Sequence, residues 1–267
     1  MIPLPPITKT QQSIIILIYR YRFLSRLHLQ QMLNHKNPQK LNLWLKDLTE
    51  KDYINRIYST KLGDNTKSAV YYIGINTIRY MKLHAEIDKE RIQKLYHEKY
   101  RSLGFQEHCK AVTDFVCNLQ SFARKQDKTA NILTKVDYTN NSDDELDLTL
   151  QTLAPDLYYI CDVTGIAQAC FVEVIDEHIP SYVLRRKIVR YIQSIQEVDP
   201  TLFSGDRFPS VAFLLPTMKK LRSLQRIIKI LRNELDDKDL DEALRCNLAT
   251  ISDIQTKSIA DGIWIKA

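Results

Sequence analysis

Residues 37–48 read NPQKLNLWLKDL, and they set the architecture expected for the N-terminal part of the chain. Pro38 suits the first turn of a helix, where its missing N–H is not needed. Leu41, Leu45 and Leu48 recur at helical spacing and form one apolar face. The other face is rich in amide and ammonium groups, which belong to Asn37, Gln39, Lys40, Asn42 and Lys46. We therefore predict an amphipathic helix that is anchored by leucines and presents polar side chains to solvent.

Helical patterns precede this stretch, and a hairpin pattern follows it. Apolar residues at helical spacing predict helices over residues 12–24 and 27–33. Residues 53–60 and 70–73 are rich in β-branched and aromatic residues, as is typical of paired strands. A further helix is expected from Asn76. This order predicts a winged helix-turn-helix domain over residues 1–86.

In a winged helix-turn-helix, the second helix of the motif enters the major groove of double-stranded DNA. Asn and Gln side chains can pair with adenine, and Lys can contact guanine or phosphate. The hairpin adds Arg56, Lys61 and Lys67 as phosphate contacts. The predicted partner is therefore double-stranded DNA. The alternative is a winged helix that makes only protein contacts.

Charge is unevenly distributed along the chain. Residues 1–136 hold 23 Lys and Arg against 11 Asp and Glu, a balance of +12. Residues 137–267 hold 15 against 21, a balance of −6, and the two halves sum to the net charge of +6. A basic front half favours a polyanionic partner. The alternative is a solvated basic surface.

Cysteine content and hydropathy indicate the compartment in which the protein is expected to lie. The 5 cysteines include no C-x-x-C pair, which indicates reduced core thiols and makes a zinc site improbable. We recognise no signal peptide and no apolar run of the ~18 residues needed to span a bilayer. We expect a cytoplasmic protein with no membrane contact. Winged helices often act as dimers, so a homodimer stays open although no dimer seam is evident.

The rest of the chain predicts a mixed α/β domain. Residues 87–103 have the charged, polar pattern of a connecting helix, and residues 104–267 form the second domain. Helices and strands alternate within it, so helices should cover both faces of a sheet. The strands are expected at residues 130–138, 157–161, 167–175 and 211–215, with an edge strand at 247–251. The helices are expected at 104–125, 180–195 and 217–235, and residues 139–147 form a polar loop.

One group of residues in this second domain could carry chemistry. Asp156 and Glu173 lie on neighbouring predicted strands, where two carboxylates can share a Mg²⁺ or Mn²⁺ ion and present a hydrolytic water. Nucleases with this layout place a Lys two positions after the second carboxylate, but here that residue is Ile175. Lys187 on the following helix could reach back to replace it. The alternative is a buried Glu173 paired with a basic residue of that helix.

Short motifs follow one another in order along nearly the whole chain. They are residues 11–25 (QQSIIILIYRYRFLS), 70–73 (VYYI), His108, Pro155-Asp156, 171–174 (FVEV), 185–191 (RRKIVRY), 211–216 (VAFLLP) and 262–264 (GIW). With this ordered set, the chain resembles the replication-relaxation family of plasmids and integrative mobile elements.

The resemblance implies a winged helix joined to a restriction-endonuclease-like domain of the PD-(D/E)xK type, with a role in replication, mobilisation or gene control. The family usually shows Glu-x-Asp on its third strand, whereas here Asp176 follows Glu173 one position late. Together with the missing Lys, this favours a non-catalytic domain without a cofactor. Three functions stay open: a DNA-binding accessory or regulator, a metal-dependent nuclease, and an adaptor for a relaxase or replication initiator.

Overall fold

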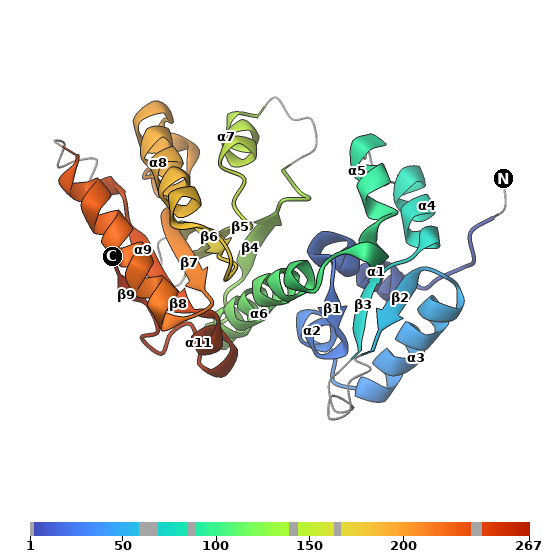
Figure 1. Cartoon of the computed structure of the whole chain (residues 1–267). Coiled ribbons are helices and arrows are strands. Elements are labelled where there is room, and N and C mark those ends of the chain that lie inside the picture. Colours follow the sequence, from blue (N-terminus) through green and yellow to red (C-terminus); the bar gives the residue numbers. More distant parts are fainter. Residues whose placement is uncertain (1–2, 59–68, 85–88, 139–143, 163–166, 236–241) are drawn as a thin grey trace. The chain divides into compact units, whose positions relative to one another are not determined.

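The computed structural model describes residues 3–58, 69–84, 89–138, 144–162, 167–235 and 242–267. The chain forms two compact units, unit 1 (Met1–Thr113) and unit 2 (Asp114–Ala267) (Figure 1). The boundary between the units lies inside helix α6 (Leu103–Lys125). The sequence predicts this helix from residue 104, but the second unit begins only in its middle.

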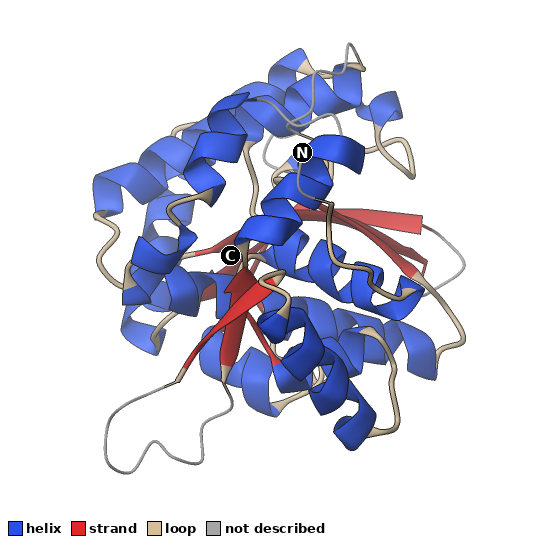
Figure 2. Cartoon of the chain, turned by 90° about the vertical axis from the view of Figure 1, so that its right-hand side faces the viewer, coloured by secondary structure: helices blue, strands red, loops and turns tan. Residues whose placement is uncertain are grey.

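Unit 1 combines helices with a small antiparallel sheet (Figures 1 and 2). Its helices are α1 (Lys9–Tyr21), α2 (Arg26–Met32), α3 (Pro38–Glu50), α4 (Ile75–His84), α5 (Lys89–Leu95), the 3₁₀ helix η1 (Glu98–Tyr100) and the first part of α6. Its strands are β1 (Leu24–Ser25), β2 (Ile54–Ile57) and β3 (Val70–Ile73), in the order β1-β3-β2. Three helices are thus followed by a pair of antiparallel strands and a fourth helix.

Helices α1 and α3 both begin at residues that cap the helix N-terminus. Thr8 caps α1 through a capping box with Gln11, which satisfies backbone donors that have no partner inside the helix. Asn37 caps α3, and Pro38 occupies its first position as predicted. Helix α3 begins where the sequence predicts it. Helix α1 begins and ends three residues earlier than the predicted 12–24, and Leu24 belongs to β1.

The segment predicted as one connecting helix, residues 87–103, contains two short helices instead. Leu95 and Glu98 are buried within unit 1. Arg22 binds the Glu98 carboxylate with both its Nε and a terminal nitrogen, and Arg101 Nε lies 3.3 Å from it. A buried carboxylate needs such partners. This ion pair joins the segment to Arg22 at the end of α1, and the segment belongs to unit 1. The charged sequence pattern of the segment predicts a solvent-exposed helix instead.

Unit 2 is a mixed α/β unit built on a six-stranded sheet. Its strands are β4 (Ala130–Thr134), β5 (Leu157–Asp162), β6 (Ala167–Val174), β7 (Ser210–Leu215), β8 (Cys246–Thr250) and β9 (Ile265–Lys266), in that order across the sheet. The pairs β6–β7 and β7–β8 are parallel, and the other neighbours are antiparallel. The helices are α7 (Glu145–Leu153), α8 (Ser181–Glu197), the 3₁₀ helix η2 (Pro200–Leu202), α9 (Met218–Asn233) and α11 (Ile251–Thr256).

Side chains alternate between the two faces of this sheet, and helices cover both. On one face, Tyr159 of β5 packs against Phe115 of α6, with ring centroids 5.8 Å apart. On the other face, Phe171 of β6 packs against Tyr191 of α8 at 5.6 Å. Because side chains of a strand alternate with a period of two, Glu173 shares the face of Phe171. This places the Glu173 carboxylate under α8.

Two elements of unit 2 differ from the sequence prediction. Helix α7 begins inside the predicted polar loop, at Glu145, and continues to Leu153, where the sequence predicts no helix. Residues 139–143 of the predicted loop lie outside the described residues, and Asp144 caps the helix by accepting from the backbone N–H of Leu146. Its Leu150 and Leu153 are buried in the core, which stabilises a helix too short to be recognised by periodicity. Strand β8 is internal, because the C-terminal strand β9 pairs with it and occupies the edge.

Two predictions from composition can be compared with the structure. All five cysteines are buried and none forms a disulfide, which confirms their role as core residues. Burial raises the pKa of Cys246 to about 12, so this thiol stays protonated. Among the helices that the structure describes, none combines the length and the apolar character needed to cross a lipid bilayer.

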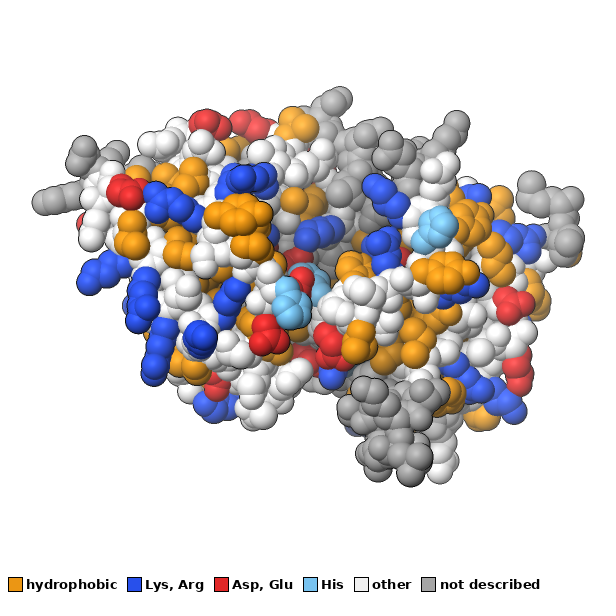
Figure 3. Space-filling model, in the orientation of Figure 1, with side chains coloured by type: hydrophobic (Ala, Val, Ile, Leu, Met, Phe, Trp, Pro, Cys, Tyr) orange, Lys and Arg blue, Asp and Glu red, His pale blue; other side chains and the backbone are white. Residues whose placement is uncertain are grey.

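Basic side chains gather on the helices of unit 2. Helix α9 contains six Lys and Arg and no Asp or Glu. Figure 3 shows several Lys and Arg side chains over α9 on the face turned to the viewer. Residues 137–267 are acidic overall, so α9 differs in charge from the rest of this part of the chain.

Candidate functional site

Helix α3 has one buried and one exposed side. Leu41, Leu45 and Leu48 have no exposed surface. The exposed side of the helix includes Gln39, Lys40, Asn42, Leu43 and Lys46. The helix therefore turns its amide and ammonium groups to solvent, as the leucine spacing predicts.

Asn37 is exposed and lies at the N-cap of α3, directly before its first residue. Its Oδ1 accepts hydrogen bonds from the backbone N–H groups of Gln39 and Lys40, each at 3.0 Å. This carbonyl oxygen is therefore engaged in capping the helix, where it satisfies donors that have no helical partner. Asn37 positions α3, whereas Gln39 and Asn42 present amide groups from the helix itself.

One of the three hairpin residues predicted to contact phosphate lies among the described residues. Arg56 of β2 is exposed, and its guanidinium lies 5.1 Å from the centre of the Tyr58 ring. The two other predicted hairpin contacts, Lys61 and Lys67, lie outside the described residues.

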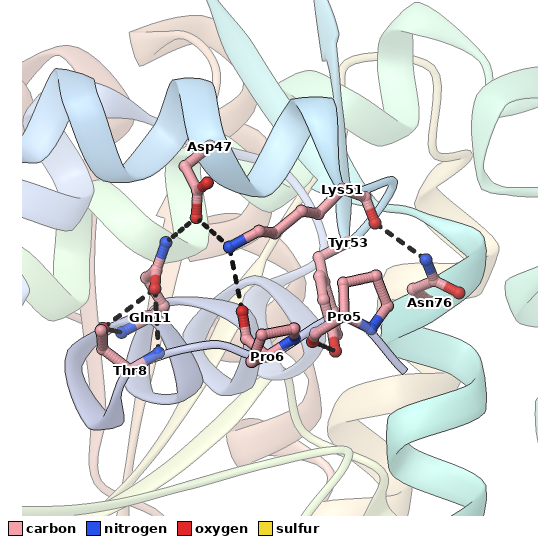
Figure 4. A network of polar contacts seen from close by, with 8 residues as sticks. All are labelled: Pro5, Pro6, Thr8, Gln11, Asp47, Lys51, Tyr53 and Asn76. Atoms are coloured by element: carbon pink, nitrogen blue, oxygen red, sulfur yellow. Dashed lines mark hydrogen bonds and ion pairs between the residues drawn. The ribbon is translucent and has the colours of Figure 1, made fainter. Parts of the chain in front are cut away.

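A polar network fixes the C-terminal half of α3 against the beginning of the chain (Figure 4). The buried Gln11 donates through Nε2 to Asp47 Oδ2 at 2.6 Å, and its Oε1 accepts from the Thr8 backbone at 2.9 Å. Lys51 Nζ lies 2.8 Å from the same Asp47 oxygen and donates to the Pro6 carbonyl at 2.9 Å. Asp47 thus links α1, α3 and the segment before α1.

Both acidic residues of α3, Asp47 and Glu50, lie near lysines. The hydrogen bond from Lys51 lowers the pKa of Asp47, so its carboxylate is charged but already paired. Glu50 at the helix end lies 3.7 Å from Lys46. The N-terminal half of the exposed side carries no acid, and it is the half that a DNA-reading helix would bring to the bases.

Unit 2 brings the two predicted carboxylates together. The antiparallel register pairs Leu157 with Val172, so Asp156 and Glu173 are directly opposite one position further. Both are buried, and the side chain of Glu173 has no exposed surface. The sequence prediction places them on neighbouring strands, and the sheet does so.

Each carboxylate is bound by an ammonium group and a second donor. Lys187 Nζ of α8 contacts Glu173 Oε2, and Tyr191 OH donates to Oε1 at 2.6 Å. Lys135 Nζ lies 2.5 Å from Asp156 Oδ1, and the backbone N–H of Val174 donates to Oδ2 at 2.8 Å. We call these four side chains, Asp156, Glu173, Lys135 and Lys187, the buried acid–lysine cluster after its two buried acids, although Lys187 is only partly buried and Lys135 is exposed.

Glu173 is the most perturbed group of this cluster. The pKa of Glu173 is raised to about 7, chiefly because burial desolvates its carboxylate; the Asp156 charge acts in the same direction, while Lys187 and Tyr191 oppose the shift. The group can therefore exchange a proton near neutral pH. Burial and the nearby Glu173 charge raise the pKa of Tyr191 strongly, so this hydroxyl remains a donor.

The cluster does not fit a divalent cation well. A Mg²⁺ or Mn²⁺ site uses oxygen ligands, and here lysine ammonium groups occupy oxygens of both carboxylates. Within the described ranges, no group of three or more His, Cys, Asp or Glu side chains gathers as metal ligands would. The chemistry that these residues support is neutralisation of two buried acids by lysines.

Sequence reasoning missed two members of this site. Lys135 follows β4, and Tyr191 lies one helical turn after Lys187 on α8. The spacing of four residues between Lys187 and Tyr191 is a usable signal, because such residues share a helix face. No local signal joins Lys135 to Asp156, since only pairing of β4 with β5 brings them together.

Replacing Asp47 with alanine should destabilise unit 1. The change leaves the buried Gln11 amide without its acceptor, which costs about 1–3 kcal/mol, and it also frees Lys51. Thermal unfolding followed by circular dichroism would measure the loss. The matched control is Glu50→Gln, because an exposed i,i+4 pair contributes only about 0.5 kcal/mol or less. Equal effects of both changes would contradict the structural role of Asp47.

Replacing Glu173 with glutamine should alter how stability depends on pH. The folded protein holds the Glu173 proton up to a pH of about 7, whereas the unfolded chain releases it near 4.5. Wild-type stability, measured relative to the variant, should therefore fall by about 1–3 kcal/mol as pH rises through this window. Urea unfolding across the window tests this, with the exposed Glu177→Gln as control. A flat difference between wild type and Glu173→Gln would contradict it.

Comparison with solved structures gives weak similarities. A structure of the restriction endonuclease FokI bound to DNA aligns with 92% of this chain at 11% identity and a TM-score of 0.31. A second FokI structure aligns with 92% at 10% identity and a TM-score of 0.30. The chain spans 43% of each FokI chain, less than half its length. TM-scores this low do not establish a shared fold.

Comparison of the sequence with protein families is more informative. No curated protein sequence gives a significant match. The family described as Replication-relaxation matches residues 16–200, which is more than half of the chain. That range includes α2, α3, the hairpin strands and both residues of the Asp156–Glu173 pair. The chain therefore belongs to the replication-relaxation family.

Proposed function

We propose that the protein is a double-stranded DNA-binding accessory or regulatory protein, and that α3 is its recognition helix. The observation that carries this proposal is the two-sided character of α3. Its leucines are fully buried, and its exposed side offers amide and ammonium groups with no acid in the N-terminal half. Such a side suits base edges and phosphates, which accept hydrogen bonds and carry negative charge.

The elements around α3 support a winged helix-turn-helix. Helix α2 precedes α3 by a short turn, and the strands β2 and β3 follow it as a wing would. Gln39 and Asn42 would read adenine, and Lys40, Lys46 and Arg56 would contact phosphates or guanine. Leu43, which is 66% exposed, adds an apolar group suited to a thymine methyl.

Family membership points to the process. A replication-relaxation protein of a plasmid or integrative element would act in replication, mobilisation or transcription control. A relaxase or a replication initiator of the same element is the partner that we propose for such a role. A homodimer would let two copies of α3 read two half-sites of the DNA.

The second unit would act in this role as a non-catalytic scaffold. Its buried acid–lysine cluster holds β4, β5, β6 and α8 together through charge pairs. Breaking a buried pair by removing one partner is costly, because it leaves an uncompensated charge. The cluster thereby makes the arrangement of this unit specific.

Replacing Lys40 and Lys46 together with glutamate should abolish duplex binding, because the variant brings two negative charges to the phosphates. Wild-type affinity should fall linearly with the logarithm of salt concentration, with a slope of about −0.9 for each phosphate neutralised. Fluorescence anisotropy with a labelled duplex measures both quantities.

The matched control for this variant is Lys94→Glu with Lys110→Glu. These exposed residues also belong to unit 1 but lie outside α3, and the change of net charge is the same. Wild-type binding by the Lys40/Lys46 variant would remove the proposal. Capture of a relaxase by a protein that binds no DNA would favour the adaptor function instead.

A metal-dependent nuclease is the second candidate, because Asp156 and Glu173 lie opposite each other and Lys187 reaches Glu173. It predicts nicked or cut DNA in the presence of Mg²⁺ or Mn²⁺, and loss of the product in Asp156→Ala. We expect no such product from supercoiled, linear or single-stranded DNA, because lysines occupy the carboxylates. Metal-dependent cleavage that Asp156→Ala abolishes would establish the nuclease.

A further inference from the structure

Helix α9 carries a row of cations that the proposed recognition helix does not account for. Lys219, Arg222, Arg226 and Lys229 are exposed and recur three or four residues apart, so they share one side of the helix. We call these four residues the α9 basic stripe. It extends about 15 Å along the helix axis.

The two other basic residues of α9, Lys220 and Arg232, have a structural role, because they donate hydrogen bonds to backbone carbonyls of unit 2. Lys220 Nζ donates to the backbone carbonyls of Glu177 and Ile179. Arg232 donates to the carbonyls of Leu244 and Ala267. By contrast, no ion pair joins a stripe residue to any other residue in the part of the chain that the structure describes.

The stripe works against the stability of its own helix. Like charges three or four residues apart repel each other, and cations in the first turns oppose the helix dipole. Surface helices ordinarily relieve such repulsion with interspersed acids, but α9 has none. Helix α8 also carries exposed Arg186 and Arg190. A polyanion lying on the stripe would relieve the repulsion among its four cations.

We propose that the α9 basic stripe is a second DNA contact, which holds the phosphate backbone of a duplex without reading its sequence. The identification of the polyanion as DNA rests on the proposed function. Each DNA strand rises 3.4 Å per phosphate, so about four phosphates span the ~15 Å of the stripe. The members of the stripe are all Lys and Arg, which are typical contacts of phosphate oxygens, and the exposed apolar residues beside them are Met218 and Ile230.

The test uses the full chain with all four stripe residues replaced by glutamine. Binding of a mixed-sequence duplex several helical turns long is measured by anisotropy over a range of salt concentrations. The variant should bind about tenfold or more weakly at low salt, and its salt slope should shrink by about 0.9 for each phosphate that it no longer neutralises. Because the stripe repels itself, the variant should unfold at the same or a higher temperature than wild type.

The matched control replaces Arg124, Lys125, Lys128 and Lys266 with glutamine, which removes the same charge from exposed positions of unit 2. Residues 236–241, which contain four Asp, stay unchanged in every variant. Equal affinity and slope for the stripe variant and the control would overturn the inference and leave an acidic protein as the occupant.

The same measurement separates this inference from the proposed function. If Lys40→Glu with Lys46→Glu loses binding and the stripe variant does not, α3 binds DNA and the stripe inference is wrong. If the stripe variant loses binding and the α3 variant does not, the stripe inference holds and α3 is not the recognition helix. A wild-type protein that binds no duplex would overturn both.

Discussion

Burial of Leu41, Leu45 and Leu48 fixes the rotation of α3 about its own axis, and the surface chemistry of unit 1 follows from it. A rotation that exposed these leucines would cost several kcal/mol, since burying each side chain contributes about 1.5–3 kcal/mol. The amide and ammonium groups of the other side must therefore meet solvent. The Gln11–Asp47–Lys51 network then joins the helix to the segment before α1.

In unit 2, the corresponding constraint is the two-residue period of the strands. It places Asp156, Glu173 and Phe171 on one face of the sheet, under α8. Two carboxylates so close together in a dry environment repel each other and are poorly solvated. Lys135 and Lys187 offset part of both costs, and Tyr191 donates to the other Glu173 oxygen, but desolvation still raises the pKa of Glu173. The layout that serves metal binding elsewhere is stabilised here by lysines.

Charge is organised at two levels in this protein. The front half is basic overall, whereas the back half is acidic but holds 10 of its 15 Lys and Arg on α8 and α9. Net charge describes long-range attraction, but contact with a phosphate depends on where individual cations stand. A unit with a negative balance can therefore still present a surface that suits DNA.

Periodic patterns and caps were enough for the mixed α/β class and for the elements that are stabilised by their own residues. The family was recognised from an ordered set of short motifs. The leucine spacing of α3, its Pro38 start and the apolar run of β6 follow from the 3.6-residue and two-residue periods of helices and strands. The pairing of Asp156 with Glu173 was also predictable, because both belong to adjacent strands. These signals could be read along the chain because periodicity and capping act within a few residues.

Other features needed the folded chain. Helix α7 is short and is stabilised by burial of Leu150 and Leu153. Glu98 is buried, although nothing in the local sequence distinguishes it from a solvent-exposed acid. Folding also showed that lysines neutralise both buried acids and that β9 covers the edge at β8. These features escaped prediction because burial and charge pairing join residues that are distant along the chain, so no local pattern carries them.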